Sequence, residues 1–454
     1  MGRVSAVPHL ETPADRFLDR RRAVDWYRSN RRRSAEIFDL LTPDAYYDRP
    51  IALRNPIAFY EGHLPAFSIN PLVKRGLGEP GIDPDFEVLF ERGIDPEDVS
   101  SVPGAAPRGW PSRPEIQAYG RAADRAVFEA LAIKDITRED NPVLARGLAA
   151  YTILEHEEMH QETLLYMWHR LPYGKKRAPR GAPQPVPGGE PPERRRVRVP
   201  AGRATLGAKR GRVIFGWDNE FEEVVAEVPE FEIDVHDVTN RDFLEFLRAG
   251  GYDRQGLWSE EGWRWRVEND VRHPAFWERR GEDWVWRGQF SEVPLPPAWP
   301  VFVSHAEASA YSRWRDSRLP TEAEFHRAAY GTPSGPERSY PWGEEPPDAS
   351  RGNFDFARWD PVPVGSFPAG ASAWGVHDLV GNGWEWTSTV FAPFPGFEPM
   401  PSYPVYSVDF FDGKHWVMKG GSFATSKTLL RRSVRNWFRG NYPYVYATFR
   451  TVTG

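Results

Sequence analysis

Apolar positions recur at helical spacing in the first third of the chain. Ala14 to Leu41 places apolar residues between charged ones, and Pro114 to Ala132 and Pro142 to Leu171 follow the same pattern. Another apolar segment opens at Asn55-Pro56 and ends near Val73. A Gly-, Pro- and Asp-rich stretch from about Gly76 to Pro114 separates it from the next helix. The pattern predicts a four-helix bundle with one long irregular connection.

The pattern changes at residue 175. Lys175 to Arg196 is rich in Pro, Gly and Arg and offers almost nothing to bury, which is typical of a linker. We expect its arginines to form a solvated face, and the alternative is that the arginine cluster binds an acidic group. From Val197 onward, short β-like runs such as RVRVPAGRATLG and EVPEFEIDV alternate with turn residues. Helices are predicted only at 239–249, 305–318 and 321–330. The sequence therefore predicts an α+β protein, with a helical bundle over 1–174, a linker over 175–196 and a turn-rich domain over 197–454.

Composition narrows the class of protein. The chain is 40% hydrophobic, and no apolar run approaches the ~20 residues that a membrane helix needs. The formal net charge of −6 gives no basic field for nucleic acid. The first residues, MGRVSAVPHLETPADRFLDRRR, lack the apolar stretch of a signal peptide. We therefore expect a cytoplasmic protein with neither a membrane nor a nucleic-acid partner.

Cysteine is absent from the sequence. That excludes disulfides, thiolate nucleophiles and cysteine-based zinc or iron–sulfur sites. Any metal must be held by histidines and carboxylates. The 19 tryptophans and an aromatic content of 14% suit the walls of a ligand pocket, although most of these rings are expected to fill a loop-rich core.

The string HEEMHQE lies within the last predicted bundle helix. His156 and His160 are four residues apart, so both side chains share one helix face and can reach one ion. Glu162 follows His160 by two residues, roughly 200° around the helix. It is therefore not expected to bind the same ion directly.

A third ligand must come from another helix. His63 is the best candidate among the 11 histidines, because it sits in the apolar segment FYEGHLPAF of a different bundle helix. A histidine among apolar residues is costly to bury unless its ring nitrogens find partners. Three neutral imidazoles suit Fe(II), Zn(II), Ni(II) or Cu(II). The alternative is two surface histidines and one core histidine with ordinary hydrogen bonds.

Five motifs in the second half occur in a fixed order: RLPTEAEFHRAA, YPWG, GNGWEWT, KGGSF and FRTV. Together they resemble the formylglycine-generating-enzyme-like (sulfatase-modifying-factor) domain, a C-type-lectin-like fold, over Val197 to Gly454. The first half, with GHLPAF and HEEMHQE, resembles the DinB-like helical bundle. The pairing of these two domains is typical of the iron-dependent sulfoxide synthases of ergothioneine and ovothiol biosynthesis.

The resemblance implies an activity and a cofactor. His63, His156 and His160 match the family's ligands to Fe(II). In this family the iron binds a thiol substrate and O2, and sulfur is joined to an imidazole carbon of hercynine, the trimethylammonium betaine of histidine. Formylglycine-generating enzymes themselves need active-site cysteines, so the absence of cysteine excludes that activity.

The resemblance also implies roles for residues outside the histidines. Tyr403 and Tyr406, in SYPVYS, match a Tyr-x-x-Tyr pair whose first member donates a proton. Asn436 and Trp437 match a segment that lines the hercynine pocket. Arg108 and Arg113 sit where the family binds the carboxylate of the thiol substrate. Because a trimethylammonium group is usually held by aromatic faces, the candidate walls of the pocket are Trp437, Phe438, Tyr442, Tyr444 and Trp386.

Two departures leave the sulfur donor open. Met159 stands where the γ-glutamylcysteine-using branch often has Gln, and Phe438 stands where that branch has Asp. The donor is therefore cysteine or γ-glutamylcysteine, or a selenosugar as in the related selenoneine synthases. A non-catalytic ligand-binding protein of the same fold is the remaining alternative, and the conjunction of the three histidines with Tyr403 argues against it.

Overall fold

The structure is a computed structural model that describes residues 18–91 and 109–454. The chain forms two compact units. The helical unit comprises Met1–Arg180 together with the short segments Gly211–Phe215 and Pro399–Tyr406, and the C-terminal unit comprises the rest. No helix in the described ranges is both long enough and apolar enough to cross a membrane.

Two of the long helices of the helical unit begin at polar caps. The Asp19 carboxylate accepts hydrogen bonds from the backbone amides of Arg21 and Arg22, and Ser112 forms a capping box with Glu115. The helices are α1 (Arg20–Phe38), α2 (Ile57–Ser68), α3 (Pro84–Leu89), α4 (Arg113–Ile133) and α5 (Leu148–Arg170). A π-helical stretch, Ile69–Gly76, continues α2.

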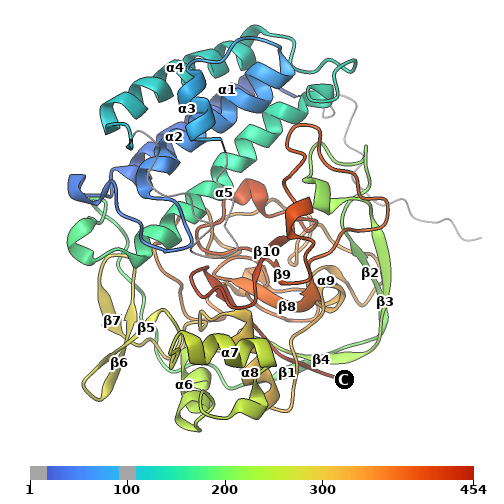
Figure 1. The fold of residues 1–454 in the computed structure, drawn as a ribbon. Coiled ribbons are helices and arrows are strands. Elements are labelled where there is room, and N and C mark those ends of the chain that lie inside the picture. Colours follow the sequence, from blue (N-terminus) through green and yellow to red (C-terminus); the bar gives the residue numbers. More distant parts are fainter. Residues whose placement is uncertain (1–17, 92–108) are drawn as a thin grey trace, which may run out of the picture. The chain divides into compact units, whose positions relative to one another are not determined.

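Four of these helices form the predicted bundle. In Figure 1 they run alongside one another, with α1 packed against α5 and α4, and α2 packed against α4 and α5. Their shared core contains Tyr27, Phe67, Val127 and Ile153, all nearly inaccessible to solvent. Helix α3 was not predicted. It lies in the Gly-, Pro- and Asp-rich connection, where Asp83 caps it and Pro84 occupies its first turn.

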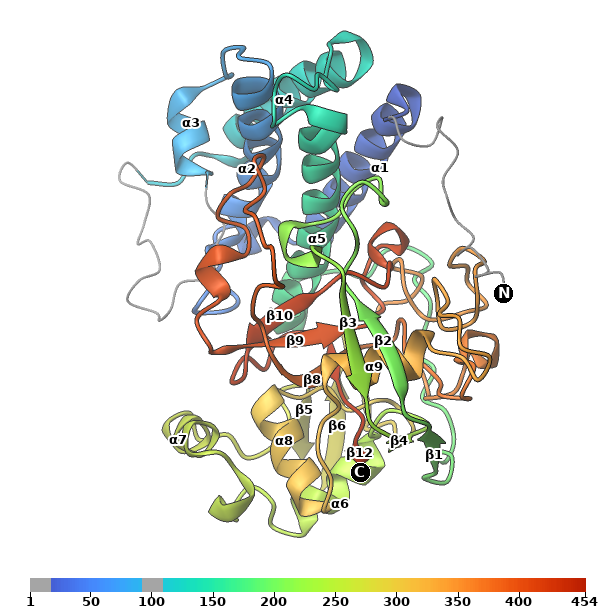
Figure 2. The same cartoon turned by 90° about the vertical axis from the view of Figure 1, so that its right-hand side faces the viewer.

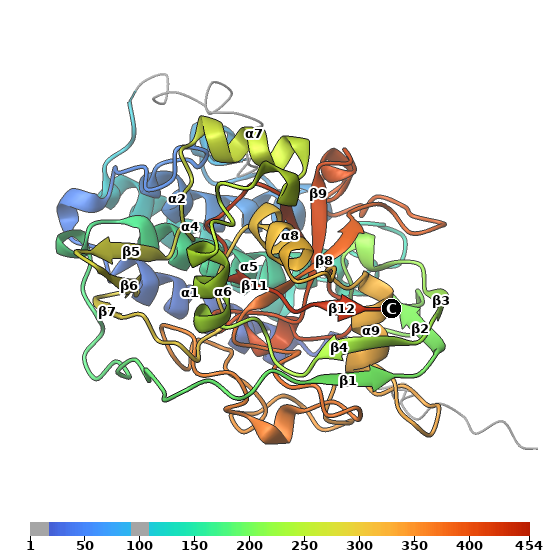
Figure 3. The same ribbon diagram turned by 90° about the horizontal axis from the view of Figure 1, so that it is seen from below.

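The C-terminal unit contains short strands in several small sheets. Its strands are β1 (Arg196–Val199), β2 (Gly202–Leu206), β3 (Val224–Val228), β4 (Phe231–Asp234), β5 (Trp277–Arg280), β6 (Asp283–Arg287), β7 (Glu292–Pro294), β8 (Trp384–Val390), β9 (His415–Lys419), β10 (Asn436–Arg439), β11 (Ala447–Thr448) and β12 (Val452–Thr453). The sheet orders are β1-β4-β12, β10-β9-β8-β11, β2-β3 and β5-β6-β7. Figure 3 shows β1, β4 and β12 side by side. The α+β prediction is confirmed.

The helices of this unit are α6 (Asn240–Arg248), α7 (Glu260–Glu268), α8 (His305–Trp314) and α9 (Glu322–Tyr330). Helix α8 ends before the predicted boundary, because Asp316 adopts a left-handed φ of 50° that a helix cannot continue through. Helix α7 was missed, since its sequence EEGWRWRVE contains a glycine and no regular apolar stripe. Figure 2 shows α9 against the β2–β3 hairpin.

The sequence motifs of this unit have structural roles. Thr321 and Glu324 of RLPTEAE form the capping box of α9. Arg450 of FRTV is fully buried and donates two hydrogen bonds to Glu385 of GNGWEWT, at 2.6 and 2.7 Å. Buried ion pairs of this kind need every polar atom close to a partner, so they restrict the chain to one arrangement.

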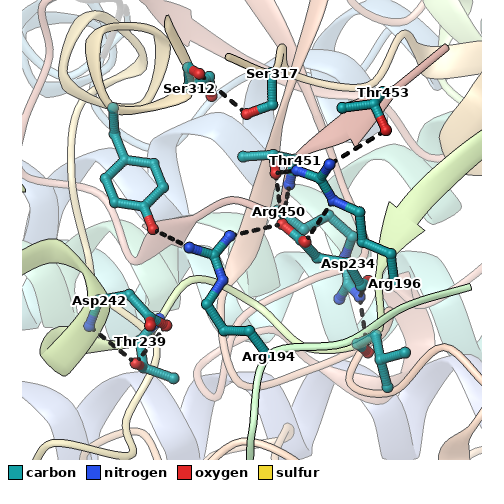
Figure 4. Close-up of polar contacts among 12 residues, drawn as sticks. Arg194, Arg196, Asp234, Thr239, Asp242, Ser312, Ser317, Arg450, Thr451 and Thr453 are labelled. Atoms are coloured by element: carbon teal, nitrogen blue, oxygen red, sulfur yellow. Dashed lines mark hydrogen bonds and ion pairs between the residues drawn. The ribbon is translucent and has the colours of Figure 1, made fainter. Parts of the chain in front are cut away.

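The prediction that the arginines of the linker are solvated is wrong for Arg194 and Arg196. Figure 4 shows Arg194 and Arg196 beside Asp234, with N–O distances of 3.6 and 3.1 Å. Arg194 also donates to the hydroxyl of Tyr311 at 2.8 Å. Composition alone predicted solvation because the carboxylate lies in a different segment, on β4.

Candidate metal centre

Two helices of the bundle bring three histidines together. Helix α2 carries His63, and α5 carries His156 and His160 one turn apart. One nitrogen from each ring lies within 4.8 Å of the other two. His63 and His156 are 1% and 4% exposed. We call these three residues the histidine cluster. It is the group that the sequence predicted.

A backbone carbonyl fixes the orientation of His63. Its Nδ1 lies 2.8 Å from the carbonyl oxygen of Phe90. Since a carbonyl can only accept, Nδ1 must carry the hydrogen and donate it, which leaves a lone pair on Nε2. That Nε2 is buried without a hydrogen-bond partner among the described residues, as is Nδ1 of His160. A buried polar atom without a partner is costly, so a ligand at these nitrogens would satisfy them.

Phenylalanines set the planes of two of these rings. Phe67 stacks on His156 with ring centroids 3.4 Å apart, and Phe59 stacks on His63 at 5.2 Å. Burial lowers the pKa of His63 to about 4. Burial, followed by the neighbouring histidines, also holds the pKa values of His156 and His160 well below their ordinary range. All three rings are therefore neutral at pH 7 and able to donate lone pairs.

The donor set fits a divalent transition metal. Histidine–metal bonds of about 2.1 Å require the ligand atoms to approach one another to at most about 4.2 Å. Side-chain movements of less than about 1 Å bring atoms within 4.8 Å to that spacing. Three neutral imidazoles without thiolate or carboxylate suit iron, zinc, nickel or copper. Glu162 is not part of the group of ligand atoms that the described residues form.

Tyr403 lies beside the histidine cluster in the same unit. Its ring packs edge-on against Phe67 at 5.0 Å and lies 6.3 Å from the ring of His156. The neighbouring Ser402 is fully buried, and its hydroxyl lies 2.7 Å from that of Thr152 on α5. Arg75 donates to the carbonyl of Ser402 at 2.6 Å. These contacts hold the segment Pro399–Tyr406, which we call the tyrosine segment, against the bundle.

Other predicted site residues of the helical unit have defined neighbours. The Tyr406 hydroxyl lies 3.4 Å from the sulfur of Met159. Arg113 forms an ion pair with Glu61 at 3.1 Å, so a substrate carboxylate would compete with Glu61 for its guanidinium. Arg108 lies outside the described residues. The substrate-binding roles assigned to these residues remain predictions.

The predicted aromatic walls fall into separate groups within the C-terminal unit. Trp437 stacks on Phe391 at 4.2 Å. Phe438 stacks on Tyr442 at 5.1 Å, and Tyr442 meets Tyr444 edge-on at 5.1 Å. Trp437 and Phe438 are successive residues of β10, so their side chains project from opposite faces of the strand.

Two further predicted residues have local or core contacts. Asn436 accepts a hydrogen bond from the backbone amide of Trp437 through its side-chain oxygen. Trp386 is fully buried, and its indole N–H donates to the carbonyl of Val303, as in a core tryptophan.

Sequence reasoning missed four residues that support the metal centre. Phe59 and Phe67 lie four residues before and after His63, a spacing that places them on one helix face and could have identified them. The Phe90 carbonyl lies in the irregular connection and Ser402 in a distant Pro-rich run, and nothing in the sequence relates either position to the histidines.

Comparison with known proteins agrees with this architecture. The model of the sulfatase-modifying factor enzyme 1-like domain matches residues 182–454, and that of the DinB superfamily matches residues 27–164. Hercynine oxygenase from Mycolicibacterium thermoresistibile is 33% identical over 95% of this chain and 92% of its own length. The chain belongs to the hercynine oxygenase family.

Further proteins are similar to parts of the chain. Hercynine oxygenase from Mycolicibacterium smegmatis is 38% identical over 68% of this chain and 71% of its own length. Ergothioneine biosynthesis protein 1 from Neurospora crassa is 30% identical over 91% of this chain and 55% of its own length. Among solved structures, PvdO from Pseudomonas aeruginosa covers 57% of this chain and 93% of its own at 20% identity, with a TM-score of 0.37.

Proposed function

We propose that this protein is an Fe(II)- and O2-dependent sulfoxide synthase of ergothioneine biosynthesis. It joins the sulfur of cysteine or γ-glutamylcysteine to the imidazole C2 of hercynine. The reaction consumes the S–H of the thiol, the C2–H of hercynine and one O2. It forms a C–S bond and an S=O bond, and the second oxygen atom leaves as water. The relatives named hercynine oxygenase and ergothioneine biosynthesis protein 1 support this choice of pathway and substrate.

One observation carries the proposal. The nitrogens of the histidine cluster lie within 4.8 Å of one another, and Tyr403 packs on the same Phe67 that stacks on His156. A set of metal donors and a phenol thus share one apolar wall. A ligand-binding protein without catalysis would have no need of either group in this position.

His63, His156 and His160 would hold the iron through their neutral rings. When bound, Fe(II) supplies a site for the thiolate and for O2 together with the electrons that pass between them. The chain contributes the orientation of its ligands: the Phe90 carbonyl holds His63 in one tautomer, and Phe67 holds the plane of His156. Apolar neighbours keep the centre dry, which strengthens electrostatic interactions there.

Tyr403 is proposed to supply the proton that directs the reaction toward coupling. Oxidation of the thiol alone would give a sulfinate, so coupling needs a proton delivered to the reduced oxygen at the right moment. An ordinary tyrosine, with a pKa of about 10, is protonated at pH 7 and can act as that donor. The tyrosine segment places the ring of Tyr403 6.3 Å from that of His156.

Hercynine carries a trimethylammonium group that cannot donate hydrogen bonds. Aromatic faces attract such a group by about 0.5–2 kcal/mol each. We assign this role to Trp437 first, because it is partly exposed and its neighbour Asn436 can offer a polar contact. The cluster of Phe438, Tyr442 and Tyr444 is the second candidate wall.

The test compares Tyr403→Phe with the unchanged protein, both loaded anaerobically with Fe(II) and then given O2, hercynine and cysteine. Tyr403→Phe should bind iron normally but shift the product from the coupled sulfoxide toward cysteine sulfinate. Tyr47→Phe is a matched control, because Tyr47 is an exposed tyrosine of the same unit. An unchanged ratio of the two products in Tyr403→Phe would mean that Tyr403 is not the donor, and Tyr406→Phe would be tested next.

A further inference from the structure

A cavity of about 300 Å³ lies within the C-terminal unit, and none of the site residues assigned above lines it. Its lining comes from the first turn of α7, from α8 and the loop that follows it, from the ends of β8 and β9, and from the turn after β10. This volume is at the lower end of the range for small-molecule sites, which is about 300–1,000 Å³.

A neutral aromatic pair forms one wall of the cavity. The rings of His305 and Trp416 are stacked with centroids 4.1 Å apart and planes 14° apart. His305 is 7% exposed, and burial lowers its pKa to about 3, so the ring is uncharged at pH 7. Its Nε2 is buried without a hydrogen-bond partner among the described residues. The pair therefore forms an uncharged aromatic part of the cavity wall.

The charged lining has an excess of positive charge. Arg313 and Lys414 line the cavity and are exposed, and neither forms an ion pair with any described residue. The Arg313 guanidinium donates one hydrogen bond, to the carbonyl of Leu257 at 2.8 Å. Arg318 also lines it but is paired with Glu324 at 2.6 Å. Glu261 is the carboxylate of the lining. Two cations on the lining of one cavity repel one another, so an anion bound between them relieves that repulsion.

Serine hydroxyls supply part of the polar lining. Ser309 and Ser388 line the cavity, and so do Ser312 and Ser317. In Figure 4 the Ser317 hydroxyl donates to the Ser312 carbonyl at 3.0 Å, which leaves its oxygen free to accept a further hydrogen bond. Serine hydroxyls can both donate and accept, so they match the hydroxyls of a polyol.

We propose that this cavity binds a small hydroxylated organic anion, such as a polyol phosphate. The anionic group lies between Arg313 and Lys414, and the hydroxyls contact the serines and Glu261. The aromatic pair packs against the carbon skeleton. A cation such as the trimethylammonium of hercynine is excluded by the two positive side chains. The cavity and the histidine cluster share no residue, so this test can fail without any consequence for the proposed function.

Isothermal titration calorimetry on the full-length, iron-loaded protein tests the proposal with four probes: glycerol 3-phosphate, inorganic phosphate, glycerol and choline. We expect saturable binding of glycerol 3-phosphate, weaker binding of inorganic phosphate, and no binding of glycerol or choline. Rising salt should weaken the binding, because exposed charges are screened. Absence of saturable binding by glycerol 3-phosphate would overturn the proposal, and so would equal affinity for phosphate alone.

Charge reversal then locates the site. Lys414→Glu and Arg313→Glu should each weaken the binding of glycerol 3-phosphate at least tenfold. Lys209→Glu is the matched control, because Lys209 is an exposed lysine of the same unit outside the cavity. Both cavity side chains are exposed, so their replacement should leave the fold intact, as thermal melting would verify. Unchanged affinity in Lys414→Glu, or equal loss in Lys209→Glu, would show that the ligand binds elsewhere.

Discussion

Replacing Thr152 with valine tests whether a single buried hydrogen bond holds the tyrosine segment in place. The hydroxyls of Thr152 and Ser402 lie 2.7 Å apart, and both residues are fully buried. Thr152 already donates to the carbonyl of Leu148 at 2.8 Å, so the shared hydrogen comes from Ser402. Valine keeps the shape of threonine but cannot accept that hydrogen bond.

The expected cost follows from burial. A buried donor left without its acceptor costs about 1–3 kcal/mol. If the segment opens locally, that cost increases the open population by about 5- to 150-fold. Arg75 still donates to the Ser402 carbonyl, so the segment is loosened rather than released. Opening removes Tyr403 from its position against Phe67 and should favour sulfinate over coupled product.

Hydrogen exchange measures the opening directly. The amides of Tyr403 and Tyr406 donate to the carbonyls of Met400 and Tyr403 at 3.0 and 3.1 Å, so their exchange reports on the integrity of the segment. Thr163→Val is the matched control, because Thr163 lies on the same helix and its hydroxyl donates only to the Met159 carbonyl one turn back. Equal exchange at these two amides in Thr152→Val and Thr163→Val would refute the reasoning.

Three further predictions follow from the same structure. Alanine at any one of the three cluster histidines should abolish Fe(II) retention after anaerobic loading and desalting, whereas the Glu162→Ala protein should retain iron, because among the described residues only these histidines offer converging donor atoms. Iron retained in a histidine variant would contradict the assignment. Calorimetry should show that hercynine binds more tightly than histidine, by about 0.5–2 kcal/mol for each aromatic contact, and that Trp437→Leu reduces this difference in binding free energy. Equal affinities of the unchanged protein for hercynine and histidine would contradict the proposal that aromatic faces hold the trimethylammonium group. Burial raises the pKa of Glu220, but Arg431, Ser433 and a backbone amide outweigh burial and hold the pKa below its ordinary value of 4.5. The ionised Glu220 therefore stabilises the folded protein above pH 4.5, and this stabilisation is lost as the pH falls through the pKa of Glu220 in the folded state. Glu220→Gln should therefore lower the free energy of unfolding by about 3 kcal/mol at pH 7. It should also reduce the fall in melting temperature at acid pH, and parallel plots of melting temperature against pH for the two proteins would contradict this prediction.

The histidine cluster was predictable because local sequence features mark each of its members. The four-residue spacing of His156 and His160 and the apolar surroundings of His63 are both local features of the sequence. The contacts of Tyr403 were not predictable from the residues alone, because the tyrosine segment lies more than 200 residues from α5, and only the resemblance to a family singled it out. The contact of the Phe90 carbonyl with His63 was not predictable either, because every residue has a backbone carbonyl and the sequence does not mark this one.

The turn-rich half shows where pattern reasoning is weakest. The runs that contain β1, β2 and β4 were recognised as β-like, whereas only the last two residues of β3 fall within a recognised run. The sheet β5-β6-β7 was missed, since its strands contain Trp, Arg and Glu with no regular alternation. There, pairing across the sheet and long-range packing decide the structure, and neither is a local property.

Mass spectrometry of the products tests the central claim most directly. The Fe(II)-loaded protein would be incubated with hercynine and ¹⁸O2 and, in separate reactions, with cysteine, γ-glutamylcysteine or a selenosugar. We predict one coupled product that contains the hercynine skeleton and a sulfur donor, with one ¹⁸O in its sulfoxide, and no such product without O2 or in His160→Ala. Coupling of the selenosugar alone would reassign the protein as a selenoneine synthase. Hercynine left unconsumed with every donor, by protein that has bound iron, would contradict the account.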